Sequence, residues 1–498
     1  MGLLHFFRPY TNSTLKQSAL YINTSADPAM QHTLDYNARR SLVSSLPWDR
    51  ERIQTTFEFS TRRHPSPYRL RGNEITEKSL KRIEFDPALP VYVFCHGYFT
   101  FNTNEKIYQA IRKNFLKHIN CNFIFVDWSK GSVNAYWTST ANSRIVGVEL
   151  ALLLEKLIKY FRIEKSKIYL MGHSLGSHII GYAGQRVPGL QKLLALDPAG
   201  PYFEKGRPEI RIDPTDGEFV EVWHTDGRKF LPEIINGLGM WDPAGHVDIY
   251  VNGGLSQPTC GSLKPALILF QTFGEKNIFN LGKDVIVCPH QYVLKLIAAS
   301  FFPTKNCVPV AFQCANYSGF LEGQCTDCGD DTSRCIIFGE GGERYRSLKN
   351  SHSWPRRFFL RLDAEQPYCM HHYEMIINLA ESVSLLQKNG NLFATVEDTQ
   401  GGVSSSVQIK LGLSNSERRQ VFLLVVPSSI CADISVVRLK WMLDSSSPLI
   451  IDRSHKPHIS LFYMNNIIPT REKSRHIKMF CGENTVLNPN EEQRFFPC

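Results

Sequence analysis

The chain has 498 residues, of which 43% are apolar and 21% charged, and Lys plus Arg exceed Asp plus Glu by nine. This length allows two or three domains, and the composition excludes collagen, a coiled coil and bulk disorder. The basic residues are scattered as short pairs, such as Arg62-Arg63 and Arg356-Arg357, so we expect weak attraction to anionic surfaces and no nucleic-acid partner.

The sequence contains no run of 18 apolar residues, which predicts that no helix spans a membrane. Residues 1–8 lack the basic start and apolar core of a signal peptide. However, 13 cysteines are heavy usage for a reducing compartment. Sequons at Asn12, Asn23 and Asn316 are compatible with glycosylation. We therefore expect a secreted glycoprotein, although a signal peptide is not evident.

Residues 1–40 form a polar leader with little fold signal. From about residue 90 to 225, short apolar runs alternate with helical patterns such as residues 145–161. This alternation predicts an α/β domain with a mostly parallel sheet and helices on both faces. The runs that we interpret as buried strands are 91–95, 123–126, 168–171, 193–196 and 219–223.

The pattern changes from about residue 373, where strand-like runs are broken by Gly, Ser and Pro without a long helical pattern. Such a pattern predicts a β-sandwich. We place the domain boundary so that residues 41–363 form the α/β domain and residues 364–498 the sandwich. The expected strands are 373–379, 392–396, 407–411, 421–425, 436–441 and 458–464.

Residues 172–176 read Gly-His-Ser-Leu-Gly, a G-x-S-x-G match. The match follows the expected strand 168–171 and opens an apolar helix, which is the setting that holds a serine hydroxyl above a sheet. Small residues are needed because the turn strains the serine backbone. Ser174 is therefore the candidate nucleophile, and the alternative is a tight glycine turn with an N-capping serine.

A serine nucleophile needs a base and an orienting acid, which follow it in the chain order Ser, acid, His. Asp197 ends the expected strand 193–196, where active-site groups of α/β sheets gather. The alternative for Asp197 is a turn-forming role. The pattern alone leaves His224, His246 and His290 open as the base.

From about residue 41 to the end, the sequence resembles the pancreatic lipase and lipoprotein lipase family. The matching motifs occur in the family's order at residues 46–48, 94–98, 126–128, 172–176, 196–201, 224–227, 245–250 and 252–254. The resemblance implies an α/β-hydrolase fold followed by a PLAT-type β-sandwich. It also implies Ser174 as nucleophile, Asp197 as acid and His290 as base. The oxyanion donors would be the backbone N–H groups of Tyr98 and Leu175.

The resemblance also implies four disulfides and a calcium loop. The pairs are Cys260–Cys288, Cys314–Cys325, Cys328–Cys335 and Cys481–Cys498, which leaves Cys95, Cys121, Cys307, Cys369 and Cys431 unassigned. A zinc site at Cys325 and Cys328 is the alternative, but no second ligand pair follows. Arg211, Asp213 and Asp216 match the calcium loop, whose alternative is a plain turn, and Glu209 stands one residue out of register.

Residues 261–287 correspond to the lid of the family, and their apolar composition predicts opening at a lipid–water interface. The resemblance thus implies a secreted lipase that cleaves triacylglycerol esters, with no cofactor for the chemistry and a structural calcium. A protein cofactor or an anionic glycan would be a further partner. The alternatives are a phospholipase that removes the first acyl chain and an inactive, yolk-protein-like lipid carrier.

Overall fold

A computed structural model forms two compact units. Unit 1 comprises Met1–Asp248, Gly261–Ala298 and Lys349–Pro355, and unit 2 comprises Ile249–Cys260, Ala299–Leu348 and Arg356–Cys498. The residues that the structure describes are 46–100, 105–227, 237–260, 287–299, 307–339, 356–378, 390–409, 419–430, 433–443, 457–459, 461–467, 477–484 and 486–498. The leader of residues 1–40 lies outside them, and the expected domain bounds 41–363 and 364–498 stay a prediction.

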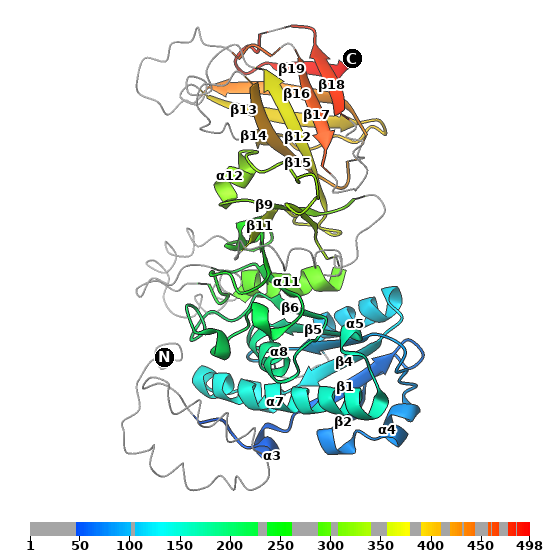
Figure 1. The fold of residues 1–498 in the computed structure, drawn as a ribbon. Helices are drawn as coiled ribbons and strands as arrows, with labels where there is room; N and C mark the ends of the chain where they lie inside the picture. The colour runs from blue at the N-terminus through cyan, green and yellow to red at the C-terminus, as the bar shows by residue number, and fades with distance from the viewer. Residues whose placement is uncertain are drawn as a thin grey trace, which may run out of the picture. The chain divides into compact units, whose positions relative to one another are not determined.

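Seven strands of unit 1 form a sheet in the order β7-β6-β5-β3-β4-β1-β2 (Figure 1). The strands from β7 to β4 pair in parallel, whereas β1 and β2 join antiparallel at the edge. Their bounds are β1 Thr56–Thr61, β2 Tyr68–Leu70, β3 Val91–Cys95, β4 Asn122–Asp127, β5 Ile168–His173, β6 Lys192–Leu196 and β7 Val220–His224. The structure therefore confirms the mostly parallel α/β sheet.

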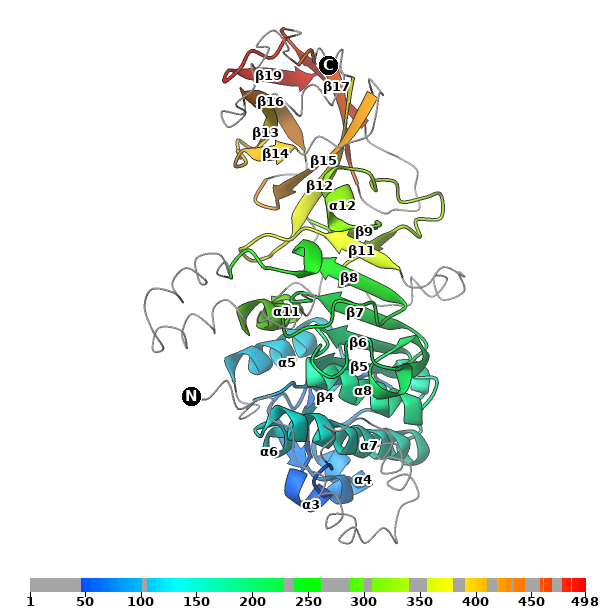
Figure 2. The ribbon, with the colours of Figure 1, turned by 90° about the vertical axis from the view of Figure 1, so that its left-hand side faces the viewer.

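Helices cover both faces of this sheet. Figure 2 shows α5 and α11 on one side and α8 on the other, where it packs against α7. The helices are α3 Arg50–Ile53, α4 Glu77–Arg82, α5 Lys106–His118, α6 Ser129–Ser132, α7 Tyr136–Phe161, α8 Leu175–Arg186 and α11 Cys288–Ala299. Among the residues described, none of the helices has the length and apolar character that crossing a membrane requires.

Helix α7 begins at Tyr136, well before the expected residue 145. Its first turns are polar in sequence but buried in the fold, which hid them from a search for apolar periodicity. Asn142, for example, is fully buried, accepts a hydrogen bond from the Trp48 N–H and donates one to the carbonyl of Gly131. Buried polar groups need such partners, and only the folded chain supplies them.

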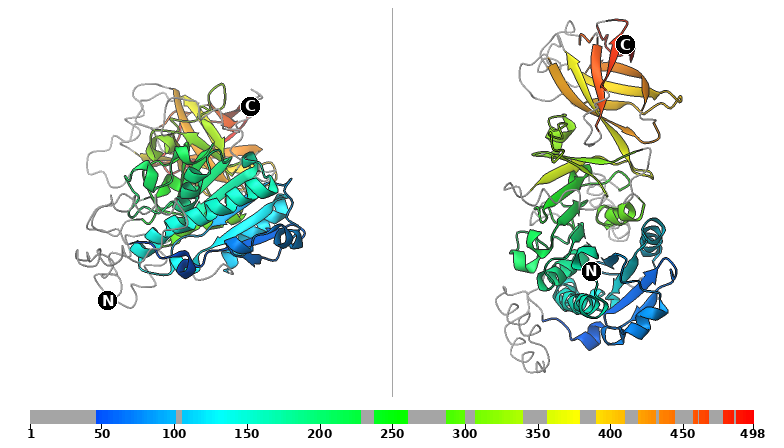
Figure 3. Two further views of the ribbon diagram at one scale, coloured as in Figure 1. Left: turned by 60° about the horizontal axis from the view of Figure 1, so that its bottom comes forward. Right: turned by 45° about the vertical axis from the view of Figure 1, so that its right-hand side comes forward.

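Unit 2 carries an eight-stranded, fully antiparallel sheet in the order β14-β13-β16-β19-β18-β17-β12-β15 (Figure 3). Its strands are β12 Met370–Asn378, β13 Gly390–Asp398, β14 Val407–Ile409, β15 Arg419–Pro427, β16 Ile434–Leu443, β17 Leu461–Asn466, β18 Ile477–Gly482 and β19 Glu492–Pro497. Trp441, Phe462, Phe480 and Phe495 are fully buried in its core. This separate antiparallel sheet confirms the expected change in architecture.

Two of these strands, β18 and β19, were not predicted from the sequence. Charged residues interrupt both, including Lys478 and Arg494. Phe480 of β18 and Phe495 of β19 are nevertheless buried in the core. The two strands pair with each other, and β18 also pairs with β17 and β19 with β16. Cross-strand partners therefore define these strands more than local composition does.

Unit 2 also contains the short antiparallel strands β9 Val310–Gln313, β10 Cys335–Ile337 and β11 Arg357–Leu360, and the helix α12 Tyr317–Leu321. Strand β8 Val247–Val251 and the turn η6 Asn252–Gly254 stand at the border between the units in the chain. The remaining single turns, all in unit 1, are η2 Gly72–Glu74, η3 Lys165–Lys167, η4 Pro208–Ile210 and η5 Pro214–Asp216.

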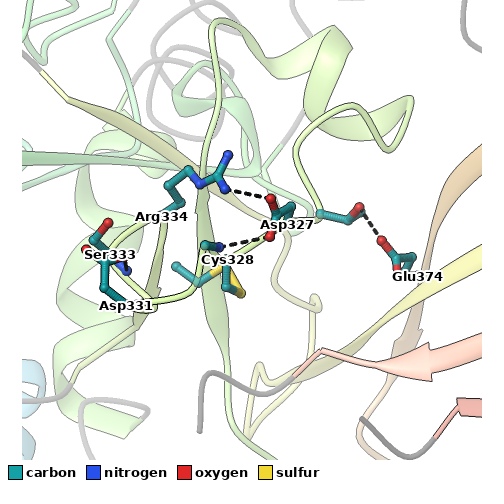
Figure 4. The surroundings of a disulfide bond; sticks show 9 residues. Asp327, Cys328, Asp331, Ser333, Arg334 and Glu374 are labelled. Carbon is teal, nitrogen blue, oxygen red and sulfur yellow. Dashed lines mark hydrogen bonds and ion pairs between the residues drawn. A yellow bond between two sulfur atoms is a disulfide. The ribbon is translucent and has the colours of Figure 1, made fainter. Parts of the chain in front are cut away.

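The disulfides of unit 2 include the expected pairs Cys314–Cys325, Cys328–Cys335 and Cys481–Cys498, and a further pair, Cys307–Cys369. Cys325 and Cys328 are thus both bonded to other cysteines and cannot ligate zinc. Figure 4 shows the surroundings of the disulfide at Cys328, where Asp327, the preceding residue, accepts a 2.6 Å hydrogen bond from the Arg334 guanidinium.

The other cysteines differ in their state. Cys260 and Cys288 are each disulfide-bonded, and their expected pairing with each other stays a prediction. Cys95 and Cys121 are buried free thiols, and burial raises the pKa of Cys121 to about 12. Cys431 lies outside the described residues.

Phe480→Ala should lower the free energy of unfolding by about 3 to 5 kcal/mol, because it leaves a cavity in the core of the antiparallel sheet. Phe480 is fully buried and stacks on Phe462 with 5.5 Å between ring centroids. Ile477→Ala on the same strand is the control, since its side chain is 52% exposed and its removal should cost at most about 0.5 kcal/mol. Denaturant unfolding of the two variants measures the difference. Equal losses would contradict this account of the core.

Candidate active site

Ser174 sits on a sharp turn between β5 and α8. Its φ of 56° lies in the left-handed region that a residue with a side chain rarely adopts, so the backbone is strained there. The Ser174 N–H donates a 3.0 Å hydrogen bond to the carbonyl of Leu196 at the end of β6, which holds the turn against the sheet. The sequence therefore predicted both the turn and its strain correctly.

The two glycines of the motif are required by close backbone packing. A Cβ at Gly172 would lie 2.2 Å from the carbonyl oxygen of Gly176. A Cβ at Gly176 would lie 2.3 Å from the carbonyl oxygen of Cys95 at the end of β3. Any side chain at either position would push α8 away from the sheet. The glycines thus set the position of the serine.

Asp197 follows β6 and is fully buried. Its Oδ1 accepts hydrogen bonds from the N–H groups of Thr225 at 2.7 Å and Asp226 at 3.0 Å. A Cβ at Gly239 would lie 2.5 Å from both carboxylate oxygens, so that residue must also lack a side chain. The carboxylate is therefore enclosed by the backbone of two loops and is not part of a simple surface turn.

His290, the third residue of α11, is the histidine that the structure brings to Asp197. Its Nδ1 lies 2.6 Å from Asp197 Oδ2, although 93 positions separate the two residues in sequence. An Nδ1–H donated to a buried carboxylate directs the other ring nitrogen, Nε2, away from the acid. This arrangement suits a general base oriented by a carboxylate.

The other two candidate bases have different partners. His246 accepts the Val220 N–H on Nδ1 and stacks on Phe219. His224 is fully buried between the carbonyl of Met240 and the Asp248 carboxylate, each 2.8 Å from a ring nitrogen. Burial alone would lower the pKa of His224, but the hydrogen bond and charge of Asp248 outweigh it and raise the pKa. These hydrogen bonds tie both rings to neighbouring loops and strands.

The loop after β3, which contains Gly97 and Tyr98, runs beside the Ser174 turn. A Cβ at Gly97 would lie 2.7 Å from the Ser174 Cβ, so the loop passes directly over the turn. The N–H of Leu175 opens α8 and lacks an internal acceptor, as first-turn N–H groups do. Within the described residues, the Tyr98 N–H also donates no hydrogen bond. Both groups are thus available to a developing oxyanion.

His96 braces this loop. Its Nε2 accepts the Trp128 N–H at 3.0 Å, so the ring proton must be on Nδ1, which donates to the carbonyl of Gly97 at 2.9 Å. The Trp128 indole N–H donates in turn to the carbonyl of His96. His96, Thr225, Asp226 and Gly239 were not singled out from the sequence, although His96 and the 224–227 motif were part of the family resemblance.

Asp213 and Asp216 are both buried in the loop that matches the calcium motif. Asp216 Oδ2 accepts the Asp213 N–H at 2.9 Å, whereas Asp216 Oδ1 is buried without a partner. Burial, and then the charge of Asp213, raise the pKa of Asp216 well above its usual range. Two close carboxylates with an unpaired oxygen fit a hard cation.

The remaining calcium candidates differ in placement. Arg211 directs its guanidinium to the carbonyls of Gly206 and Ile212, which leaves its own carbonyl as the group to offer. The Glu209 residue is exposed. Within the described part of the chain, no three His, Cys, Asp or Glu side chains gather as a metal cluster. Backbone carbonyls would therefore have to complete the ligand set.

A parallel α/β sheet that carries a serine on such a turn, beside a hydrogen-bonded acid–histidine pair, is the arrangement of serine hydrolases. The model of the Lipase family matches residues 21–368, and the chain belongs to that family. This confirms the resemblance found in the motifs.

Individual relatives are similar over most of their length. Pancreatic lipase-related protein 3 of Homo sapiens is 28% identical over 91% of this chain and 91% of its own length. Pancreatic triacylglycerol lipase of Mus musculus is 31% identical over 70% of this chain and 74% of its own. Inactive pancreatic lipase-related protein 1 of Mus musculus is 30% identical over 70% of this chain and 72% of its own length. The similarity thus extends to a relative named as a triacylglycerol lipase and to one named as inactive.

Gly176→Ala should destabilise unit 1 by about 1 to 3 kcal/mol or more, because the new methyl group would overlap the Cys95 carbonyl. Gly72→Ala is the control, since its Cβ would meet no atom closer than 3.7 Å. Thermal unfolding monitored by circular dichroism compares the two. An unchanged melting temperature for Gly176→Ala would show that the turn is looser than described.

Proposed function

We propose that this protein is a secreted lipase that hydrolyses the carboxylic esters of triacylglycerols at a lipid–water interface. The observation that carries the proposal is the buried Asp197–His290 hydrogen bond at the carboxyl end of the sheet that bears Ser174. The similarity to a pancreatic triacylglycerol lipase supports the substrate class.

In the proposed mechanism, Ser174 Oγ attacks the ester carbonyl while His290 Nε2 takes the hydroxyl proton. The proton then passes from His290 to the leaving alcohol, and an acyl–serine ester remains. Water next attacks this ester and gives a proton to His290, which returns it to Ser174 as the fatty acid leaves. Asp197 holds the ring and stabilises the imidazolium that forms in each half.

The negative charge that develops on the carbonyl oxygen would be held by the N–H groups of Tyr98 and Leu175. Fixed backbone donors need no reorganisation during the reaction, and each is worth roughly 2.7 to 4 kcal/mol in related enzymes. The His96 brace supports this role because it fixes the loop that carries Tyr98.

A calcium ion would be structural and would take no part in the ester chemistry. Asp213, Asp216 and the carbonyl of Arg211 would hold it, and it would neutralise the two buried carboxylates. The loop they belong to packs on α8, since a Cβ at Gly181 would meet Asp216 Oδ2 at 2.8 Å. An ion there would stabilise α8, the helix that follows Ser174.

Further parts of the proposal concern location and partners. The disulfides of unit 2 suit an oxidising, extracellular environment. Asn316 belongs to a sequon and is exposed. Its Oδ1 caps α12, so a glycan would be attached through Nδ2. The antiparallel unit would be a PLAT-type sandwich, and a protein cofactor or an anionic glycan would be an additional partner. The lid, residues 261–287, lies almost entirely outside the described residues.

A comparison of substrates tests the proposal against its alternatives. The protein should release fatty acid from a triacylglycerol emulsion faster than from phosphatidylcholine vesicles, and a serine-reactive phosphonate should stop both reactions. A preference for phosphatidylcholine would instead indicate a phospholipase. Lipid binding without any hydrolysis would indicate an inactive carrier.

Ser174→Ala should abolish ester hydrolysis, with a loss of roughly 10⁶-fold typical for a catalytic serine. The rate of ester hydrolysis by His290→Ala should fall to a similar level, because nucleophile and base act as one unit. Hydrolysis of a soluble ester by purified, folded variants measures both.

His246→Ala serves as the control for His290→Ala, since His246 accepts the Val220 N–H and stacks on Phe219. It should still hydrolyse the ester, with some loss of stability. An active His290→Ala together with an inactive His246→Ala or His224→Ala would refute the choice of base.

Removal of calcium should lower the melting temperature without altering the mechanism, because the buried carboxyl groups of Asp213 and Asp216 would then lose the positive charge that compensates their burial. Asp216→Asn should reduce the difference in melting temperature between the chelated and the calcium-loaded protein, whereas Glu209→Gln should leave that difference unchanged. Differential scanning calorimetry and elemental analysis provide the measurements. If exhaustive chelation has no effect and no calcium is found, the loop is a plain turn.

A further inference from the structure

We infer that His173, the residue before the candidate nucleophile, is a positioning residue that sets the backbone of the base relative to Ser174. The inference rests on the proposed function, since it assigns His173 a role only through His290. Its basis is one contact: His173 Nε2 lies 3.1 Å from the backbone carbonyl oxygen of His290.

This contact joins two segments that are remote in sequence. His173 ends β5, which is followed directly by the Ser174 turn, whereas His290 lies 117 positions later in the first turn of α11. The two imidazole rings lie beside each other, with 4.8 Å between centroids. His173 and His290 are each only 6% exposed, so water competes little for the bond.

The direction of the hydrogen bond follows from chemistry. A carbonyl oxygen only accepts, so Nε2 must carry the proton and donate it. Burial, and then the neighbouring His290 ring, lower the pKa of His173 well below its usual range, so the ring is neutral near pH 7. Its Nδ1 is accordingly unprotonated, and it is buried without a hydrogen-bond partner in the described structure.

The His173 ring also lies against the loop expected to supply the oxyanion donor. A Cβ at Gly97 would approach His173 Nδ1 to 3.2 Å and the His173 carbonyl oxygen to 3.0 Å. One side chain thus contacts the base segment through Nε2 and borders the Tyr98 loop through Nδ1. An unpartnered nitrogen in such a place is costly, so the residue is not an arbitrary filler of the core.

Asp197 alone cannot fix the base. Its bond to Nδ1 orients the imidazole ring, but the ring can swing if the start of α11 shifts. The first turn of a helix lacks internal acceptors for its N–H groups, so its position depends on outside contacts. The His290 carbonyl has two lone pairs and can accept from His173 in addition to its helical donor. The two bonds together hold both ring and backbone.

The role predicts a defined kinetic signature. His173→Leu keeps a similar volume but loses the donor, and it should lower kcat on a small soluble p-nitrophenyl ester by about 10- to 100-fold, as misplacement of a reacting group by about 1 Å does. KM should change little, because His173 does not bind substrate in this account. His173→Gln places an amide nitrogen as many bonds from Cα as Nε2, and it should recover most of kcat.

His246→Leu is the matched control, because this buried histidine also bonds to backbone in unit 1, where it accepts the Val220 N–H and stacks on Phe219. Its melting temperature should fall by an amount similar to that of His173→Leu, whereas its kcat should stay at the wild-type value. If His173→Leu does not fold, His173→Gln and His173→Asn decide instead. The Asn amide is one bond too short to reach the carbonyl, so it should lose the kcat that Gln retains.

The outcomes separate this inference from the proposed function. Wild-type kcat in His173→Leu, or equal kcat in the Gln and Asn variants, would overturn the positioning role while an inactive Ser174→Ala still supports the lipase. A wild-type protein that hydrolyses no ester would overturn both. A loss of kcat with unchanged KM, restored by Gln, would establish the role.

Discussion

The buried carboxylate of Asp197 determines how the rest of the candidate site is arranged. A buried charge is costly unless it is hydrogen-bonded, and Asp197 accepts from Thr225, Asp226 and the His290 ring. These donors come from the end of β7 and the start of α11. The hydrogen bonds to this one carboxylate therefore bring together the segment after β7 and the start of α11. The same carboxylate lies against Gly239 and orients the candidate base.

The buried histidines of unit 1 show how environment gives one residue type several roles. His96 accepts a backbone N–H, so its neutral tautomer braces the Tyr98 loop. His178 accepts from Ile212 and donates to the carbonyl of Ala199, which links α8 to the loops after β6. His224 lies between two acceptors and has a raised pKa. Within the described residues, His290 is the histidine whose ring is hydrogen-bonded to Asp197.

Unit 2 is stabilised by a different balance of forces. Its antiparallel sheet encloses an aromatic core that includes Trp441 and Phe462. Beside this sheet in sequence, the residues from Cys307 to Cys335 form short strands and loops joined by disulfides, one of which reaches Cys369. Covalent links limit the unfolded conformations of such loop-rich segments. Unit 2 thus combines an aromatic core with covalent cross-links.

The sequence by itself determined the alternation of strands and helices in the α/β unit, the strained turn at Ser174 and the position of Asp197 at a strand end. Apolar periodicity and glycine spacing are local signals, so they can be read without the fold. It could not choose among His224, His246 and His290 without a resemblance, and it missed β18 and β19. Those features depend on partners far away in the chain. The candidate base is distinguished by a hydrogen bond across 93 positions, and the strands are defined by neighbours that cover their apolar faces, so both features needed the tertiary structure.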